Sequence, residues 1–277
     1  FGDTSDTGSH GSTSNSIRGV FNYGDVPNSI VRMDYTVISS SGGVASFGDL
    51  SFVTRDGPFG AGDNTRGILG GSAGGPTNMG GQPGKGVNFI DYITFATAGN
   101  SARFGELTTA RRGVSACSSP TRTVWGGGYI KPSNHTDTVD FVVTQTFGDA
   151  TDFGNLTQSR GHMGAASSPT RGVWFGGSIY TAPGPAYTLY DIIDYVTLAT
   201  EGNATDFGNL AAAKHFTTGG VSNSIRGAHG GSNTDPATLN VIEFVTIAST
   251  GNATDFGDLT TLQYSCAGAS DSHGGLG

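Results

Sequence analysis

The chain has 277 residues, of which 47 are glycine and only 13% are charged, and its formal net charge is −8 at pH 7. This balance argues against a nucleic-acid-binding surface, which needs a basic footprint, and no apolar run approaches the length of a membrane-spanning helix. Regular aromatic and β-branched runs supply apolar surface to bury, so the glycine content does not indicate disorder. The first residue is Phe1 rather than Met, so we expect the chain to be part of a longer polypeptide.

One short motif recurs along the chain and reads Gly-Asn-Ala-Thr-Asp-Phe-Gly-Asp-Leu in its last copy, residues 251–259. Further copies, increasingly divergent toward the N-terminus, are found at 202–210, 148–156, 99–107, 47–50 and 1–3. The phenylalanines of successive copies lie 46, 57, 49, 54 and 49 residues apart. A period near fifty is typical of a repeat array or a β-propeller.

Each unit predicts four strands. In the unit from Phe153 to Asp206, the expected strands are 153–156, which ends the preceding sheet, then 161–167, 172–177 and 190–199. The second strand ends in two glycines, and the third is rich in β-branched and aromatic residues. No stretch shows helical periodicity with caps. Four strands joined by short turns predict an antiparallel sheet that must pack against the neighbouring copies around an axis.

Counting the copies predicts the number of blades. Second strands occur at 18–21, 66–69, 122–125, 171–174, 226–229 and, in degraded form, 273–276. Third strands occur at 31–35, 89–92, 138–141, 193–195 and 242–244, and none follows the sixth second strand. We therefore expect one domain, an all-β six-bladed β-propeller with units of approximately 1–46, 47–103, 104–152, 153–206, 207–255 and 256–277. Its last blade is closed by both termini, which removes the open edge, and lacks a strand. We expect that strand in a continuation of the chain; an incomplete blade, or one filled by a neighbour, is the alternative.

The order of these features resembles the kelch repeat. Double glycines stand at 70–71, 126–127, 176–177 and 230–231, aromatic residues at Tyr92, Phe141, Tyr195 and Phe244, and Phe104, Phe153, Phe207 and Phe256 where kelch repeats have tryptophan. That replacement, and Asn22-Tyr23-Gly24 in place of the first double glycine, mark a divergent version. The repeated motif is also similar to repeats in structural and tail-associated proteins of tailed bacteriophages. This second resemblance implies a virion or extracellular location, whereas kelch-like propellers serve many functions.

The meander places the variable loops, residues 72–86, 129–137, 178–189 and 232–238, on one face of the ring. Recognition usually resides in such loops on a rigid scaffold, and aromatic rings with polar neighbours suit glycans or peptides. The candidate ligand-binding residues on this face are Tyr129, Lys131, His135, Tyr180 and Tyr187, together with the cations Arg111, Arg160 and Lys214 that precede the first strands. The alternative is a set of exposed loop residues with no ligand.

The opposite face repeats a second set of charges once per unit. We predict that Arg66, Arg122, Arg171 and Arg226 form structural ion pairs or turn hydrogen bonds with Asp152, Asp206 and Asp255, because arginine matches a carboxylate bidentately. Calcium at the Gly-Asn-Ala-Thr-Asp turns is an alternative, although no single turn offers several well-spaced carboxylates. Cys117 and Cys266 are expected on opposite strand faces, as unlinked small apolar residues.

The sequence contains no recognised catalytic motif. Its six histidines are scattered, without a His-x-His or His-Glu-x-x-His pattern. We therefore expect a non-enzymatic adhesion module of a tail fibre or similar assembly, without a cofactor. Its expected partners are a host-surface glycan or protein, other virion subunits or identical copies, with no nucleic acid and no membrane insertion. The alternatives are a purely structural assembly component and a glycan-active enzyme whose carboxylates meet at the axis.

Overall fold

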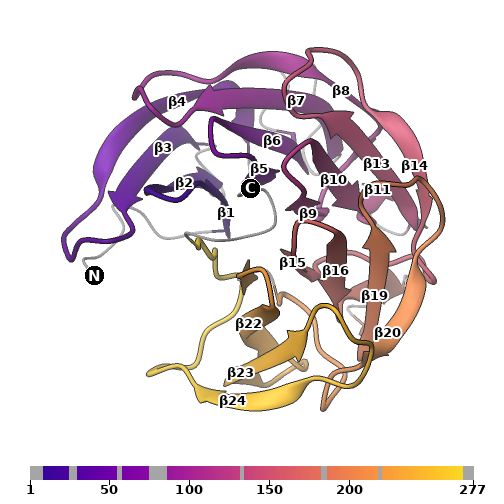
Figure 1. The fold of residues 1–277 in the computed structure, drawn as a ribbon. Helices are drawn as coiled ribbons and strands as arrows, with labels where there is room; N and C mark the ends of the chain where they lie inside the picture. Colours follow the sequence, from indigo (N-terminus) through magenta and orange to yellow (C-terminus); the bar gives the residue numbers. More distant parts are fainter. Residues whose placement is uncertain are drawn as a thin grey trace.

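The computed structural model describes residues 9–24, 30–54, 58–74, 86–131, 134–181, 186–217 and 220–270. Every regular element in these residues is a β-strand, and none of them forms a helix that is long and apolar enough to span a membrane. Five four-stranded antiparallel sheets follow one another around a central axis (Figure 1). This arrangement confirms the prediction of a β-propeller.

We number the five sheets as blades in chain order. Blade 1 contains β1 (Ser9–Ser14), β2 (Arg18–Gly24), β3 (Ile30–Val37) and β4 (Ala45–Thr54). Blade 2 contains β5 (Phe59–Gly62), β6 (Arg66–Ala73), β7 (Gly86–Thr94) and β8 (Ala102–Arg111). Blade 3 contains β9 (Ser115–Ser118), β10 (Arg122–Gly126), β13 (Thr138–Val143) and β14 (Thr151–Asn155). Blade 4 contains β15 (Gly164–Ser167), β16 (Arg171–Phe175), β19 (Ile192–Thr197) and β20 (Thr205–Asn209). Blade 5 contains β21 (Val221–Ser222), β22 (Arg226–Asn233), β23 (Thr238–Thr246) and β24 (Thr254–Asp258).

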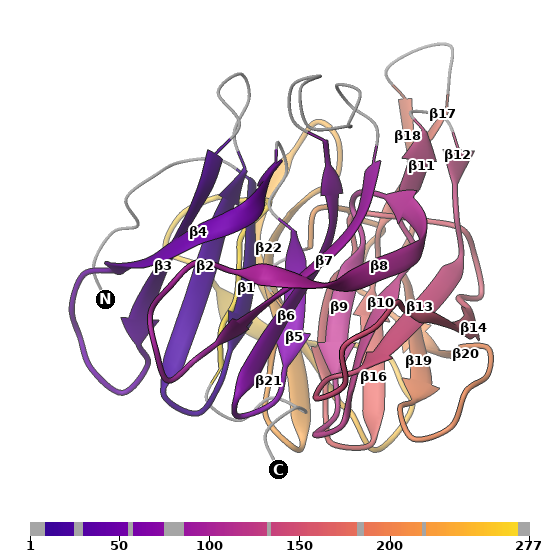
Figure 2. The same cartoon turned by 90° about the horizontal axis from the view of Figure 1, so that it is seen from above.

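Two loops contain strands where the sequence predicted only variable segments. The pairs are β11 (Tyr129–Lys131) with β12 (Asn134–His135), and β17 (Ser178–Thr181) with β18 (Ala186–Leu189). Each pair is inserted between the second and third strands of its blade. Figure 2 shows both ribbons projecting from the same side of the ring, which we call the ribbon face.

A β-bulge recurs between the third and fourth strands of every blade. The pairing register shifts at Met33/Asp34, Ile90/Asp91, Val139/Asp140, Ile193/Asp194 and Ile242/Glu243. Each shift adjoins the glycine that follows the motif phenylalanine; at Gly208 and Gly257, φ is 146° and 139°. Only glycine adopts such a backbone without strain, and a bulge re-aims the neighbouring side chain. The bulge therefore favours glycine after the motif phenylalanine in blades 1, 3, 4 and 5, where φ lies between 139° and 153°.

Apolar residues hold each blade against the next. The motif phenylalanine of one blade packs on the second and third strands of the following blade, as Phe104 does in a cluster with Trp125 and Val142. Equivalent clusters join blades 1 and 2, 3 and 4, and 4 and 5. Burying one large apolar side chain contributes roughly 1.5–3 kcal/mol. The core is therefore divided into wedges between the blades.

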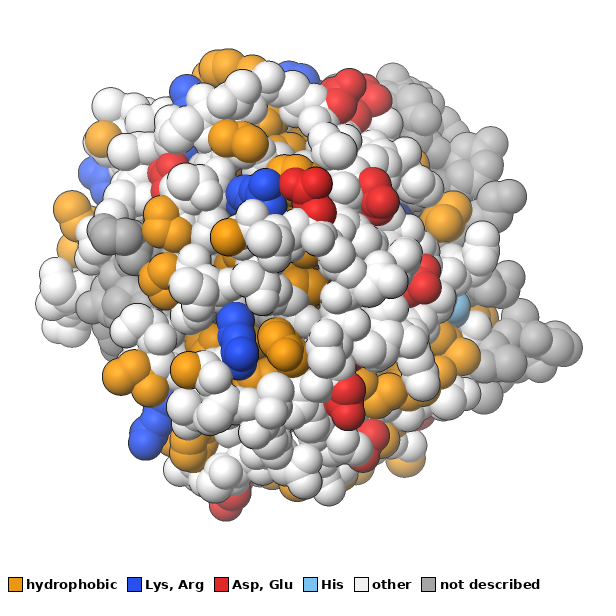
Figure 3. Space-filling model, turned by 45° about the vertical axis from the view of Figure 1, so that its right-hand side comes forward, with side chains coloured by type: hydrophobic (Ala, Val, Ile, Leu, Met, Phe, Trp, Pro, Cys, Tyr) orange, Lys and Arg blue, Asp and Glu red, His pale blue; other side chains and the backbone are white. Residues whose placement is uncertain are grey.

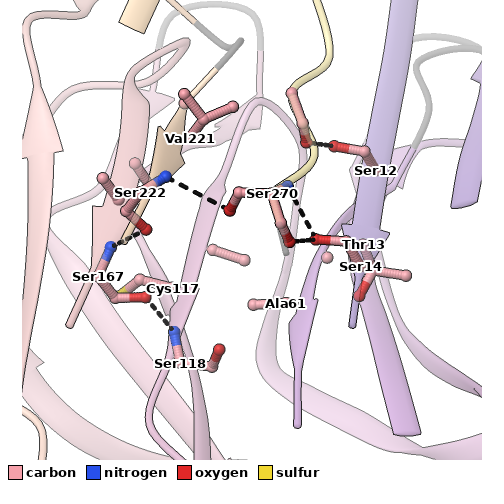
Figure 4. A pocket seen from close by; sticks show the side chains of 16 residues that line it. Ser12, Thr13, Ser14, Ala61, Cys117, Ser118, Ser167, Val221, Ser222 and Ser270 are labelled. Carbon is pink, nitrogen blue, oxygen red and sulfur yellow. Dashed lines mark hydrogen bonds between the residues drawn. The ribbon is translucent and has the colours of Figure 1, made fainter. Parts of the chain in front are cut away.

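Residue 270 lies close to the first blade at the centre of the ring. Around the axis, each backbone N–H donates to the hydroxyl of the next position: Gly62 to Ser118 (3.3 Å), Ser118 to Ser167 (3.2 Å), Ser167 to Ser222 (3.2 Å), Ser222 to Ser270 (3.4 Å) and Ser270 to Ser14 (3.3 Å). Four of these bonds appear in Figure 4. Six positions thus surround the axis, and five of them belong to four-stranded sheets. The remaining segments of the predicted sixth blade, 1–3 and 273–276, lie outside the described residues.

Candidate functional site

The ribbon face carries a continuous chain of ring contacts. Centroid distances are 4.2 Å for His135–Tyr129, 4.7 Å for Tyr129–His162, 4.4 Å for His162–Phe216, 4.2 Å for Phe216–His215, 4.7 Å for His215–Tyr187 and 5.4 Å for Tyr187–Tyr180. These seven residues form what we call the aromatic–histidine cluster. Their angles are tilted or edge-to-face, the geometries that aromatic pairs prefer. The cluster connects the two ribbons of blades 3 and 4 through residues of the connections that follow these blades, His162, His215 and Phe216.

Hydrogen bonds fix the polar edges of these rings. The backbone N–H of Tyr180 donates to Nε2 of His135 (2.9 Å), which ties the second ribbon to the first. Ser178 Oγ lies 3.0 Å from Nδ1 of His215 and 3.3 Å from the hydroxyl of Tyr129. Ser178 therefore joins two members of the cluster. The rings are held in place while parts of Tyr180 and Tyr187 stay exposed.

The cluster is uncharged near neutral pH. Loss of hydration lowers the pKa of His215 to about 4, and loss of hydration with the nearby charge of Arg112 lowers the pKa of His162 to about 3. Burial also lowers the pKa of His135 and raises the pKa of Tyr187. The histidines are therefore neutral and the tyrosine keeps its proton. The site can offer ring faces together with neutral donors and acceptors.

The tyrosines and histidine predicted from the variable loops are thus brought together, although to different depths. Tyr129 is buried, whereas His135, Tyr180 and Tyr187 are half-buried. Lys131 lies at the end of β11, and its side chain is outside the described residues. The surface that a ligand could touch is therefore centred on Tyr180 and Tyr187.

The three cations predicted for the same face occupy another environment. Arg111, Arg160 and Lys214 are buried and pair with third-strand carboxylates: Arg111 with Asp140 (3.0 Å), Arg160 with Asp194 (2.9 Å) and Lys214 with Glu243. Each connection between blades carries its cation inward to the carboxylate beside the bulge. Buried ions must be paired because they have lost their hydration. These residues are structural contacts rather than ligand-facing ones.

Sequence reasoning did not select His162, His215 and Phe216. Phe216 belongs to a recurring turn position, two residues after Arg111, Arg160, Lys214 and Gln263, where Gly113, His162, Phe216 and Ser265 all have φ between 53° and 63°. The last three donate their N–H to the carbonyl of the preceding one: His162 to Gly113 and Phe216 to His162 at 2.9 Å, and Ser265 to Phe216 at 3.3 Å. Aligning the repeats on the basic residue would have shown that His162 and Phe216 share this position.

The arginines that begin the second strands lie on aromatic rings. Arg122, Arg171 and Arg226 stand 4.5–4.6 Å from the ring centroids of Phe141, Tyr195 and Phe244, and Arg66 stands 5.3 Å from that of Tyr92. Arg66, Arg122 and Arg171 also donate to carbonyls of the following blade, those of Gln145, Leu198 and Ile247.

The predicted partners of these arginines have other contacts. Asp206 and Asp255 instead accept hydrogen bonds from Gly208 and Gly257 within their own strands. The charge of Asp152 acts on Arg111. The arginines therefore link blades through cation–π contacts and hydrogen bonds to backbone carbonyls. Arg122 also forms an ion pair with Glu201 of the next blade (2.9 Å), a carboxylate other than the three predicted.

A small cavity lies on the axis. It has a volume of about 50 Å³ and is lined by serines and other small residues, including Ser12, Ser118 and Ser167, with Cys117 beside them (Figure 4). Its described lining contains no carboxylate. Cys117 and Cys266 are unlinked, and the described residues contain no group of three histidine, cysteine or acidic side chains that could hold a metal ion. The space suits a few water molecules.

The fold and these contacts define a β-propeller that carries an aromatic–histidine cluster on one face. No model of a known protein family and no curated protein matches the chain.

Proposed function

We propose that the protein is a non-enzymatic adhesion module whose ribbon face recognises a surface glycan or protein. The supporting observation is the chain of ring contacts that ends in the partly exposed Tyr180 and Tyr187. Tyrosine rings give a ligand a large, rigid apolar area with a hydroxyl at the edge. Few charges accompany them in the ribbons: the strands β11, β12, β17 and β18 contain one lysine, Lys131, and no acidic residue. Uncharged side chains and backbone also form most of the side of the molecule drawn in Figure 3. Stacking and neutral hydrogen bonds would therefore carry recognition.

We also propose where the module works. The kelch-like repeat order and the phage-like repeated motif support a place in a virion appendage, such as a tail fibre, or in another extracellular assembly. Its partners would be a host-surface glycan or protein and other subunits of the assembly, with identical copies as a further possibility. The proposed binding needs neither a cofactor nor calcium, and it involves neither nucleic acid nor membrane insertion.

We propose further that the complete ring has six kelch-like blades, the last formed with both chain ends. The support is the position of Ser270, whose N–H donates to Ser14 and whose hydroxyl accepts from Ser222. Ser14→Ala should open this contact, so amide hydrogen exchange at residues 266–270 should become faster. Unchanged exchange would count against closure through residue 270.

A glycan array tests the adhesion proposal. We expect selective binding by the wild-type protein and at least a tenfold loss in Tyr187→Ala, because stacking on one ring contributes about 1.4 kcal/mol or more. Phe147→Ala is the control, since this ring is also exposed and lies outside the cluster. Equal binding by Tyr187→Ala and wild type would contradict the ribbon-face site. Release of shortened glycan during the assay would favour the glycan-active enzyme instead.

A further inference from the structure

The described residues leave Phe256, on the side of blade 5 that faces away from blade 4, largely exposed. Phe256 of β24 is 63% exposed, whereas the equivalent Phe47, Phe104, Phe153 and Phe207 are between 2% and 4% exposed. Val245 of β23 and Ile247, which follows that strand, cover Phe207 together with Ala253 of the next turn. Figure 1 shows β24 at one end of the arc of sheets and blade 1 at the other. An apolar surface therefore remains where the other four interfaces have a following blade.

Blade 1, at the other end of the arc of sheets, also has an apolar residue that is only partly covered. Ile38 follows the third strand of blade 1 and donates its N–H to Ile17. Leu198 and Ile247 make the same bond to Thr170 and Ile225. The side chains of Leu198 and Ile247 are fully buried by the preceding blade, but that of Ile38 is half-buried. A segment that covers Phe256 would therefore be able to contact Ile38 of blade 1 as well.

A polar socket accompanies each covered phenylalanine. The residue after the motif leucine donates to the third-strand carboxylate of the next blade. In blade 3 this residue is Thr157, whose N–H and hydroxyl lie 3.0 Å and 2.6 Å from the carboxylate of Asp194. Ser51 and Thr108 contact Asp91 and Asp140 in the same way, and the N–H of Ala211 donates to Glu243 (2.9 Å). Thr260 stands at this position after Leu259, and it is exposed.

The backbone contacts of β24 differ from those of β20 as well. At Gly208 an added Cβ would meet the carbonyl of Gly251 in the next turn, and the N–H of Asn209 donates to Oδ1 of Asn252 (3.0 Å). At Gly257 an added Cβ would meet nothing within 4 Å. One docking geometry is thus repeated between the blades. It combines the glycine contact, the asparagine contact, the hydrogen bonds to the third-strand carboxylate and the apolar cover over the phenylalanine.

We propose that this side of blade 5 binds a β-hairpin with the chemistry of the hairpins that cover the other four blades. Its first strand would carry an apolar–acidic–aromatic sequence, with the carboxylate on Thr260 and the following aliphatic residues on Phe256. Its turn would contain Gly-Asn, with the asparagine oxygen accepting from Asp258. The proposal rests on the six-position ring proposed above.

The chain itself indicates that this hairpin comes from another stretch of polypeptide. All five apolar–acidic–aromatic strands of the repeats lie in blades 1 to 5. Residues 1–8 read FGDTSDTG and residues 271–277 read DSHGGLG, and neither segment contains that sequence. The occupant is therefore a hairpin supplied from outside these segments.

A synthetic peptide of residues 238–258 provides the probe, because this hairpin covers β20 and the motif in β24 is almost the same as that in β20. We expect saturable binding to the 277-residue protein in fluorescence anisotropy. Phe256→Ala in the protein should weaken binding at least tenfold. Glu243→Gln in the peptide should do the same, because it removes a charge-assisted hydrogen bond.

Val143→Ala is the matched protein control, since Val143 is 45% exposed in blade 3 and binding should not change. Circular dichroism of each variant checks that the propeller stays folded. Absence of binding, or binding that survives Phe256→Ala, would overturn the proposal. Neither outcome bears on adhesion, which is measured with Tyr187→Ala on the ribbon face, or on ring closure, which is measured by exchange at residues 266–270.

Discussion

Residues 202–210 and 251–259 have nearly the same sequence and very different surroundings. They differ only at Asn209 and Asp258, and both form a turn followed by an outer strand with a bulge at glycine. Phe207 is buried at 3% exposure, while Phe256 is 63% exposed. The local sequence therefore determines the strand and the bulge, whereas the next blade determines how much each residue stabilises the fold. Variants at matched positions can separate these two contributions.

The largest expected effect is at the carboxylate inside a covered socket. Asp194→Asn leaves the guanidinium of Arg160 buried without a countercharge, because Asp194 is its ion-pair partner at 2.9 Å. Removing one member of a buried pair typically costs about 3–5 kcal/mol, and we expect this loss in the free energy of unfolding by urea. Asp255→Asn, on the exposed outer strand, should change it by less than about 0.5 kcal/mol. Similar losses in the two variants would contradict the comparison.

The two phenylalanines test the apolar part directly. Phe207→Ala removes a ring packed among Val245, Ile247 and Tyr195, and such truncations cost about 3–5 kcal/mol. Phe256→Ala removes a mostly exposed ring and should cost less than about 1 kcal/mol. Thermal unfolding of both variants by calorimetry measures the difference. If Phe256→Ala were as destabilising as Phe207→Ala, Phe256 would have to be covered in solution.

The motif glycines separate backbone strain from crowding. Gly208 and Gly257 have nearly the same φ, so alanine at either position carries a similar strain of about 1–3 kcal/mol. Only at Gly208 would the new Cβ also meet the next turn, at Gly251. Overpacking adds about 1–3 kcal/mol, so Gly208→Ala should be the more destabilising by that amount in urea unfolding. Equal effects would mean that the turn moves aside freely.

The smallest expected difference concerns the arginines. Arg171 and Arg226 both lie 4.6 Å from an aromatic centroid, but Arg171 also donates to Ile247 and Ala248 of the next blade. Among the described residues, no following blade offers such carbonyls to Arg226. We expect Arg171→Ala to cost about 1 kcal/mol more than Arg226→Ala, because it loses these hydrogen bonds as well as the ring contact. Chemical denaturation with both variants measures this; the reverse order would contradict it.

Much of the fold could be predicted from the sequence because each blade repeats the same short sequence motifs. The Phe-Gly pair specifies an outer strand with a bulge, and the apolar–acidic–aromatic sequence marks the third strand. The double glycine ends the second strand only in blades 3 and 4; in blades 2 and 5 the strand continues through it with a register shift, to Ala73 and Asn233. Position within the unit also predicted that Tyr129, His135, Tyr180 and Tyr187 share a face. The ribbons β11–β12 and β17–β18 could not be recognised, since their short strands alternate with polar and glycine-rich residues and lack the β-branched runs of the main sheets.

The sequence by itself determined the period and the strand order within a blade, because these depend on contacts close along the chain. Only the tertiary structure decided the partners of the charged residues. Arg111, Arg160 and Lys214 begin segments that look like surface loops, yet they turn inward to carboxylates more than 25 residues away. It also decided that one copy of the motif is exposed, because burial depends on what lies alongside a strand and not on the strand's own residues.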